Sequence, residues 1–344
     1  MSSTQHEDQL IDVRNNIGFL RLLFACMVVV GHSSELAYGN RSHEPLMRLF
    51  GTVSLGSVAV DGFFLISGYL ITQSFQRSPS AGRYLWHRAL RIYPGFLVAF
   101  LVSLLIGAMA GGNLASALSP TLAARALTLN PPWLDGAFTN LPIPVLNGSL
   151  WTIAYEFRCY ILVLILGMLG VLRRRSWVAI AAFLLLILTV LPKPFETPAG
   201  LVPLVGTIQE GVRLTAMFLV GAVFCLYAVP LRANAAACSV VVAVGLLFTP
   251  LAEAGLAVFG GYALFWLGLQ FKSGALSRIN GKDDISYGVY LYAFPLTNLL
   301  IYWRRDISWG AVAAIVWAAS IVAGWVSWKV VEQPAQRLKR WTPS

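Results

Sequence analysis

The chain has 344 residues, of which 57% are hydrophobic and only 12% are charged, and its mean hydropathy is +0.70. Soluble domains carry about 25% charged residues, so this composition excludes an ordinary soluble domain and predicts a polytopic membrane protein. The net charge of +10 is explained by basic cytoplasmic loops and anionic lipid. We therefore expect membrane lipid, and not nucleic acid, as a partner.

Apolar runs of roughly the 20 residues that a bilayer requires recur along the whole chain. In chain order they cover 17–36, 54–75, 92–111, 149–171, 177–192, 212–228, 235–250, 253–271, 285–303 and 308–328. The run 177–192 is short, and only Thr249-Pro250 separates the seventh run from the eighth. The pattern predicts an all-α fold, a polytopic transmembrane bundle of about ten helices.

The distribution of Lys and Arg predicts the orientation, because short cytoplasmic loops carry an excess of positive charge. With a cytoplasmic N-terminus, the inside loops hold Arg14, Arg77, Arg83, Arg88, Arg173, Arg174, Arg175, Arg232, Lys272, Arg278, Lys282, Arg337, Lys339 and Arg340. We therefore expect both termini to be cytoplasmic. The chain then divides into a cytoplasmic segment (1–16), a transmembrane domain (17–331) and a cytoplasmic tail (332–344).

Two connections are long enough to have structure of their own. The basic stretch 77–91 predicts an interfacial helix on the cytoplasmic side, because its arginines and aromatic residues suit the membrane surface. The polar stretch 112–148 falls outside, and a loop of this length is often a lid or a substrate platform.

The first apolar run contains two polar residues that predict a site. Arg21 and His32 are eleven residues apart, so they share a helix face at a separation of roughly 16 Å. A cation within a membrane span is costly and usually faces a cavity. A neutral His32 could act as general base, and Glu35, one turn on, could orient its ring.

Further charged residues interrupt the second and third runs. Asp61 lies deep in an apolar helix, where we expect Arg21 or Arg158 as its partner, in either a substrate site or a structural ion pair. Arg88 and Arg91 lie one turn apart and precede Tyr93. The two guanidiniums are either anchors at the cytoplasmic surface or a clamp for a phosphorylated cofactor.

The fourth run begins with polar and aromatic residues that suit a sugar. Ser149 and Glu156 share a helix face, and Trp151 or Tyr155 could stack on a sugar ring. Ser286 and Tyr287 are weaker candidates for substrate contacts. The four cysteines lack the spacing of metal ligands, so no metal site is expected.

In this order the motifs are specific, and the chain from Ile17 to Trp341 resembles the acyltransferase-3 family of bacterial membrane acyltransferases. The matching segments are Arg21-x10-His32, 60–70 (VDGFFLISGYL), 88–94 (Arg-x-x-Arg-Ile-Tyr-Pro), 149–156 (Ser-Leu-Trp-x4-Glu), 285–295 (ISYGVYLYAFP) and 332–334 (Glu-Gln-Pro). The resemblance implies a multi-pass protein of the bacterial inner membrane that uses acetyl-CoA as acyl donor. It also implies that His32 is catalytic with Arg21 as its partner, and that Arg88 and Arg91 belong to the acyl-CoA site.

The chain differs from many family members in two respects. Ala293 stands where many members have His, and no periplasmic hydrolase-like domain follows Glu332-Gln333-Pro334. The second difference leaves open a direct transfer or a separate periplasmic partner protein.

We therefore expect an O-acetyltransferase that moves an acetyl group to a hydroxyl of a carbohydrate acceptor, either lipopolysaccharide O-antigen or exopolysaccharide. Glu156 is expected to assist His32 and Arg21 in catalysis. A secreted small molecule such as a macrolide, or peptidoglycan, is an alternative acceptor. A transporter with Arg21, Asp61 and Glu156 along its pathway is a more distant alternative.

Overall fold

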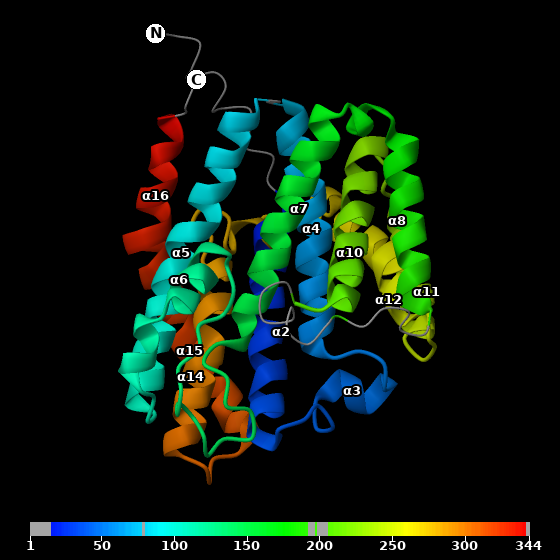
Figure 1. The fold of residues 1–344 in the computed structure, drawn as a ribbon. Helices are drawn as coiled ribbons and strands as arrows, with labels where there is room; N and C mark the ends of the chain where they lie inside the picture. Colours follow the sequence, from blue (N-terminus) through cyan, green and yellow to red (C-terminus); the bar gives the residue numbers. More distant parts are fainter. Residues whose placement is uncertain (1–14, 78–79, 192–196, 198–205, 342–344) are drawn as a thin grey trace.

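The computed structural model describes residues 15–77, 80–191, 197 and 206–341. Within these residues all regular elements are helices, and most of them run in parallel or antiparallel directions through one bundle (Figure 1). The long helices are α2 (Ile17–Tyr38), α4 (Leu55–Arg77), α5 (Ala81–Met109), α7 (Trp151–Met168), α8 (Arg175–Val190), α10 (Ile208–Tyr227), α11 (Ala233–Leu246), α14 (Ser286–Trp303) and α15 (Trp309–Ser327).

Shorter elements extend or connect these helices. The eighth predicted run is one helix, Ala252–Gln270, assembled from α12 (Ala252–Gly255), η4 (Leu256–Gly260), α13 (Gly261–Phe265) and η5 (Trp266–Gln270). The remaining elements are α3 (Pro45–Phe50), η1 (Leu114–Leu118), α6 (Pro120–Leu127), η2 (Gly148–Leu150), η3 (Val171–Arg173), η6 (Leu276–Arg278), η7 (Trp328–Glu332), α16 (Gln333–Arg337) and η8 (Leu338–Arg340).

The predicted all-α membrane bundle is confirmed, and each predicted apolar run overlaps a helix. In the described part of the chain, seven helices are long and apolar enough to cross a membrane, whereas α8 and α11 are shorter apolar helices. The seventh and eighth predicted runs, 235–250 and 253–271, are two separate helices, because the chain turns at Thr249 and Pro250. The exact number of crossings and the side of the termini stay predictions.

The prediction of a separate interfacial helix at 77–91 is wrong. Helix α5 begins at Ala81 and continues for 29 residues, with Pro94 inside it. A proline in a helix removes one backbone hydrogen bond, a loss that a helix of this length tolerates. Arg88 and Arg91 on this first part of α5 line a cavity described below, whereas Arg83 is exposed.

The predicted tail from residue 332 is also structured up to residue 340. The last candidate span runs without a break from Trp309 to Arg340. The indole Nε1 of Trp86 donates to the carbonyl of Leu338 at 3.2 Å, which holds the end of this helix against α5. The predicted N-terminal segment lies almost entirely outside the described residues.

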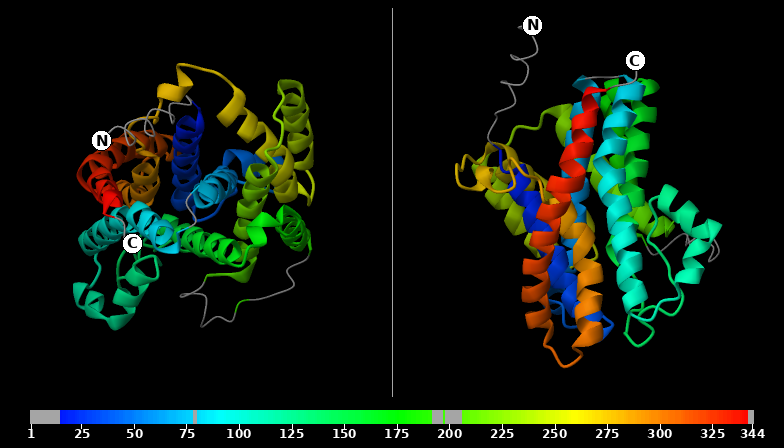
Figure 2. Two further views of the ribbon diagram at one scale, coloured as in Figure 1. Left: turned by 90° about the horizontal axis from the view of Figure 1, so that it is seen from above. Right: turned by 90° about the vertical axis from the view of Figure 1, so that its left-hand side faces the viewer.

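Helices α2 and α4 occupy the middle of the bundle, as the view from above shows (Figure 2). Helix α2 packs against α4, α14 and α15, and α4 packs against α10 and α7. The predicted long loop 112–148 contains η1 and α6, which project from one side of the bundle (Figure 2). This arrangement places the polar residues of α2 and α4 toward the interior of the protein.

The closest helix contact, between α4 and α10, depends on two glycines. A Cβ on Gly68 would lie 1.9 Å from the carbonyl oxygen of Phe218, and one on Gly221 would lie 2.0 Å from the carbonyl oxygen of Leu65. Small residues at such positions let two membrane helices approach closely, with backbone packed on backbone.

We predict that Gly68→Ala lowers the free energy of unfolding by about 3 kcal/mol, because the backbone of α10 cannot yield to the added methyl group. Gly245→Ala in α11 is the matched control, since no atom lies within 4 Å of its added Cβ. Thermal unfolding of both variants in detergent checks this. Equal midpoints for the two variants would contradict the close contact.

Candidate active site

Besides mainly apolar hollows of about 440 and 430 Å³, the described residues line two polar cavities, one near each end of the bundle. The larger, of about 360 Å³, lies where α5, α14 and the C-terminal helices meet, and we call it the basic cavity because five basic side chains line it. These are Arg21, Arg88, Arg91, Lys282 and Lys339. Asp284 and Glu156 are the acidic side chains that line it.

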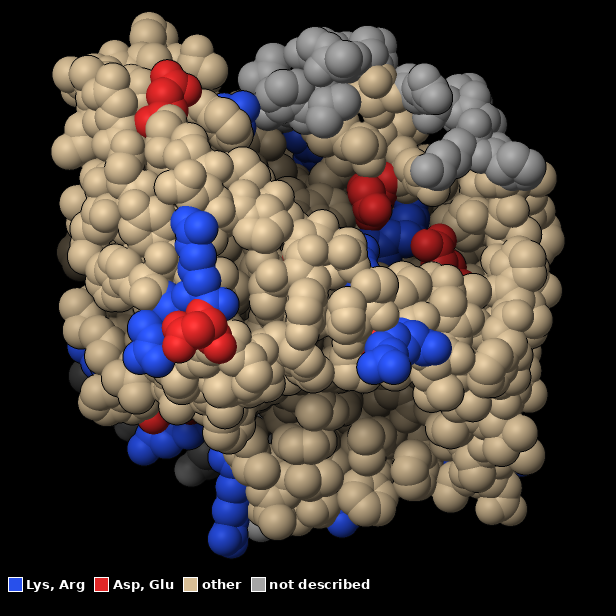
Figure 3. All heavy atoms as spheres, turned by 90° about the horizontal axis from the view of Figure 1, so that it is seen from below, with Lys and Arg blue, Asp and Glu red and all other residues tan. Residues whose placement is uncertain are grey.

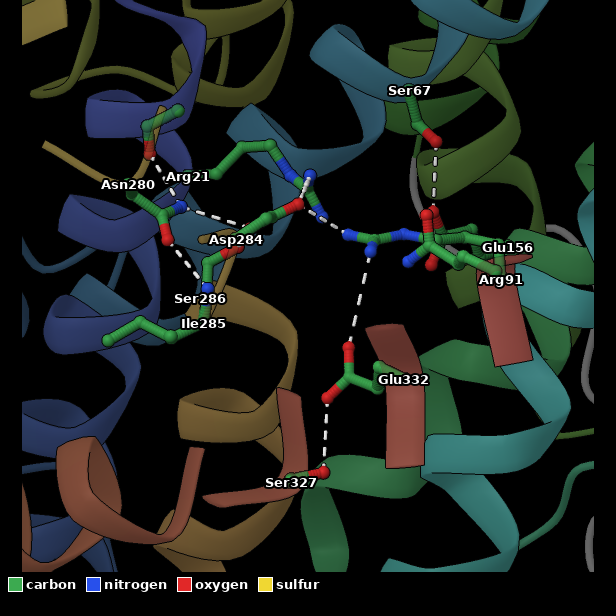
Figure 4. Close-up of polar contacts among 12 residues, drawn as sticks. Arg21, Ser67, Arg91, Glu156, Asn280, Asp284, Ile285, Ser286, Ser327 and Glu332 are labelled. Atoms are coloured by element: carbon green, nitrogen blue, oxygen red, sulfur yellow. Dashed lines mark hydrogen bonds and ion pairs between the residues drawn. The ribbon is translucent and has the colours of Figure 1, made fainter. Parts of the chain in front are cut away.

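Asp284 connects the cationic residues of two helices (Figure 4). Its carboxylate oxygen Oδ2 accepts from Arg21 of α2 and from Arg91 of α5, the latter at 2.6 Å. The other oxygen, Oδ1, accepts from the Asn280 amide at 3.0 Å and from the Ser286 hydroxyl at 2.5 Å. All four donors converge on one half-buried carboxylate, which fixes where both guanidiniums lie.

Arg91 has a second acidic neighbour. The carboxylate of Glu332, in the π-helical segment η7, lies 4.0 Å from Arg91 and accepts from the Ser327 hydroxyl at 3.1 Å (Figure 4). The ring of Tyr287 lies under the Arg91 guanidinium, 5.7 Å from its centroid. Arg91 is therefore held on several sides, and a ligand would meet a preformed cation.

Glu156 lies deeper in the same cavity, on α7. One of its oxygens accepts from the Ser67 hydroxyl at 2.9 Å and from the Tyr160 hydroxyl at 2.6 Å (Figure 4). The two hydroxyls fix the orientation of this carboxylate. Glu156 therefore lines the basic cavity and not the cavity that contains His32.

The second cavity, of about 60 Å³, contains His32 and is called the histidine cavity. The ring nitrogen Nδ1 of His32 lies 3.3 Å from Glu35, and Glu35 in turn accepts from Arg41 at 2.9 Å. This geometry agrees with the expectation that Glu35 orients the ring. With Nδ1 facing Glu35, Nε2 is the nitrogen left for a substrate.

Acidic and basic side chains gather in a hollow on the face seen from below (Figure 3). The charged residues that line the histidine cavity are Glu35, Arg41, Glu44, Glu210 and Arg213. They come from the end of α2, the connection to α3 and the start of α10. This is the end of the bundle opposite to α16, so the two cavities approach one another from opposite sides.

Val60 and Tyr290 line both cavities and thus form their common wall. The Tyr290 hydroxyl donates to the carbonyl of Ser149 at 2.9 Å and lies 2.6 Å from the Thr152 hydroxyl. The ring of Phe294 packs edge-on against the ring of His32, with the ring centroids 5.1 Å apart. A group that passes between the cavities would pass Tyr290.

The structure brings most of the sequence-predicted residues to one of the two cavities. The basic cavity receives Arg21, Arg88, Arg91, Glu156, Ser286 and Tyr287. The histidine cavity receives His32 and Trp151. Arg21 and His32 therefore lie on one helix but line different cavities.

Besides Asp61, three predicted residues line neither of the two cavities. The Tyr93 hydroxyl donates to the carbonyl of Leu127 at 2.8 Å, and the Tyr155 hydroxyl donates to that of Thr207 at 2.8 Å, so both are engaged outside the cavities. Ser149 is fully buried, and its carbonyl, not its hydroxyl, contacts Tyr290. Their predicted roles in ligand binding stay predictions.

The expected partner of Asp61 is corrected. Its carboxylate pairs with Arg213 of α10, and neither Arg21 nor Arg158 pairs with it. Arg213 also binds Glu210 at 2.8 Å. The sequence could not select the partner, because α10 lies about 150 residues further along the chain. Asp61 is 2% exposed, so its structural role as an ion-pair partner is the one that the geometry supports.

Several residues of the basic cavity were not predicted, above all Asp284 and Lys339. The pair Asp283-Asp284 does give a signal, since two acids directly follow Lys282 in a loop expected to be basic. Asp283 pairs with Lys329 at 2.8 Å, and Asp284 turns inward. Ser67 and Tyr160 carry no signal, because a serine and a tyrosine in a membrane helix are common.

A family model of the acyltransferase domain matches residues 14–328. An O-acetyl transferase of Shigella phage Sf6 is 28% identical over 337 residues, which cover 91% of this chain and 93% of the relative. Nodulation protein 10 of Rhizobium leguminosarum bv. viciae is 32% identical over 161 residues, 43% of this chain and 42% of the relative.

Acyltransferase MdmB of Streptomyces mycarofaciens is 28% identical over 342 residues, 84% of this chain and 83% of the relative. No solved structure shows a significant match.

We predict that Asp284→Asn lowers the free energy of unfolding by about 3 kcal/mol at neutral pH, because it leaves two half-buried guanidiniums without their shared anion. Burial raises the pKa of Asp284, but Arg21, Arg91, Ser286 and Asn280 together hold it well below its usual range. The stabilisation is therefore present above about pH 4, the pKa of an unfolded Asp, and declines below it.

Thermal unfolding of wild type and Asp284→Asn in detergent from pH 7 to pH 3 measures this difference. Asp306→Asn is the control, because Asp306 is an exposed loop residue paired only with Arg304. Its effect should stay within about 0.5 kcal/mol. A difference between wild type and Asp284→Asn that does not shrink below pH 4 would contradict the assignment.

Proposed function

The chain belongs to the acyltransferase family whose domain model covers residues 14–328, and we propose that it is an inner-membrane O-acetyltransferase. It moves an acetyl group from cytoplasmic acetyl-CoA to a hydroxyl of an envelope carbohydrate, either lipopolysaccharide O-antigen or exopolysaccharide. That the protein is a multi-pass membrane acyltransferase rests on the family and on the apolar helices.

One observation carries the proposal: a large basic cavity and a small polar cavity with a histidine share a wall inside the bundle. A reaction between a cytoplasmic donor and an external acceptor needs such an arrangement. Each substrate enters from its own side, and the two reacting groups meet at the wall formed by Val60 and Tyr290.

The basic cavity suits the donor. Phosphate groups accept charge-assisted hydrogen bonds from guanidinium and ammonium groups, and five such side chains line this cavity. The flexible pantetheine arm then extends from the phosphates past Glu156 toward Tyr290. The thioester carbonyl thereby reaches the common wall without passage of the nucleotide through the membrane.

His32 acts as the general base. Its Nε2 removes the proton from the acceptor hydroxyl while Glu35 holds Nδ1 in place, 3.3 Å away. The resulting oxyanion attacks the thioester carbonyl, the carbon–sulfur bond breaks, and the thiolate of CoA receives the proton from His32. The products are the acetyl ester and free CoA, and His32 is neutral again.

The histidine cavity suits a sugar hydroxyl. Carboxylates of Glu35 and Glu210 can accept from sugar hydroxyls, and the indole of Trp151 offers a face for stacking against C–H groups. At about 60 Å³ the cavity admits a hydroxyl-bearing edge and not a whole oligosaccharide. The rest of the acceptor then lies in the hollow at the outer face (Figure 3).

We predict that His32→Ala lowers the rate of acetyl transfer by about 10²–10⁴-fold, because the acceptor hydroxyl loses its base. His43→Ala is the matched control, since His43 is exposed in the connection that follows α2 and lines neither cavity. The assay measures release of CoA and labelled ester from purified protein in lipid nanodiscs.

The acceptor is identified in cells. NMR of purified surface polysaccharide compares a deletion strain complemented with wild type, His32→Ala or His43→Ala at equal membrane abundance. An O-acetyl signal restored by wild type and His43→Ala, but not by His32→Ala, supports the proposal. An unchanged polysaccharide would direct the search to a secreted small molecule or peptidoglycan, and full rescue by His32→Ala would remove His32 as the base.

A further inference from the structure

The C-terminal segment 329–340 follows the part of the chain that the family model matches. It continues the helix that begins at Trp309 and lies beside the basic cavity, where the indole of Trp86 of α5 donates to the carbonyl of Leu338. At its start, the carboxylate of Asp283 accepts from the Trp328 indole at 3.0 Å and from Lys329 at 2.8 Å. The segment is therefore fixed at both ends.

Two residues of this segment line the basic cavity, Gln336 and Lys339. The ammonium group of Lys339 donates to the amide oxygen of Gln336 at 3.1 Å. The neighbouring Arg337 and Arg340 are exposed and lie outside the cavity lining. Lys339, and neither Arg337 nor Arg340, therefore lines the cavity.

Four of the five cations of the basic cavity fall into two groups. Arg21 and Arg91 are ion-paired with the same carboxylate, that of Asp284. Arg88, by contrast, has no ion pair among the described residues. Its guanidinium donates a long hydrogen bond of 3.4 Å to Ser74 and lies 5.8 and 5.9 Å from the ring centroids of Tyr84 and Tyr160. Lys339 likewise has no acidic partner within salt-bridge distance in the described part of the chain.

Unpartnered donors accompany these two cations. The buried Nε–H of Arg88 and the buried amide nitrogen of Gln336 have no acceptor among the described residues. Buried polar groups without a partner are rare in folded proteins and need an explanation. Both belong to side chains of the cavity lining, so a small rotation would direct each toward an anion in the cavity.

We propose that Lys339 and Gln336 complete, together with Arg88, the site that binds the phosphates of the acyl donor. Phosphate oxygens are the acceptors that an ammonium, a guanidinium and an amide N–H share. Arg88 lies one turn nearer the start of α5 than Arg91, which places this group at the mouth of the cavity and the paired arginines further inside. The inference rests on the proposed use of acyl-CoA.

The test measures kcat and KM of full-length purified protein with three donors: acetyl-CoA, acetyl-dephospho-CoA and S-acetyl-phosphopantetheine. Lys339→Ala should raise KM for acetyl-CoA roughly tenfold with little change in kcat, because the lost contact is the same in the ground state and the transition state. Lys339→Arg should retain most of the affinity. Gln336→Ala should raise KM by a smaller factor.

Arg337→Ala and Arg340→Ala are the matched controls, since each removes one positive charge from the same segment without a cavity contact. Their KM values should equal that of wild type. With S-acetyl-phosphopantetheine, which lacks the nucleotide and its phosphates, the KM values of Lys339→Ala and wild type should differ by less than with acetyl-CoA. Equal unfolding midpoints establish that the variants are folded.

The two hypotheses fail in different ways. Wild-type turnover of acetyl-CoA combined with an unchanged KM in Lys339→Ala would overturn the inference and leave the proposed function intact. Absence of wild-type turnover with any acyl-CoA would remove the proposed function first. A KM increase that occurs only in nanodiscs with anionic lipid, and not in neutral lipid, would assign Lys339 to a lipid headgroup and also overturn the inference.

Discussion

The arrangement of the basic cavity depends on the carboxylate of Asp284. It binds Arg21 of α2 and Arg91 of α5 at once, and Asn280 adds the backbone of α2 to the same group by donating to the carbonyl of Gly18 at 3.0 Å. Charges inside a membrane bundle are costly unless they are paired or face water. One anion therefore determines how two cationic helices and the loop before α14 fit together.

A second ion pair fixes the other end of the bundle. Asp61 of α4 and Arg213 of α10 form a buried pair, and Glu210 extends it toward the histidine cavity. The same two helices touch backbone to backbone at Gly68 and Gly221. The glycines set the separation of the helices and the ion pair sets their register, so the wall of the histidine cavity is rigid where Arg213 lines it.

Tyr290 links the two ends. It lines both cavities, and its hydroxyl is held by the carbonyl of Ser149 and the hydroxyl of Thr152. Under the proposed function, the donor and the acceptor approach this residue from opposite sides of the membrane. The unpaired cations at the mouth then attract phosphates, while the paired arginines, Glu156 and the aromatic side chains define the path of the uncharged arm.

The sequence by itself determined the membrane bundle and the two helices at 235–250 and 253–271, because hydropathy and loop charge are local properties of the chain. Most of the residues that its short motifs singled out line one of the two cavities. The sequence also placed Arg21 and His32 on one face of α2 and Glu35 beside His32. Only the tertiary structure decided that Arg21 and His32 line different cavities and that Arg213 is the partner of Asp61. It alone revealed that Asp284 joins two arginines and that Lys339 lines the basic cavity. The ion pairs of Asp61 and Asp284 join residues 152 to 263 positions apart, and a distant partner is selected by helix packing, which leaves no periodic signal in the sequence.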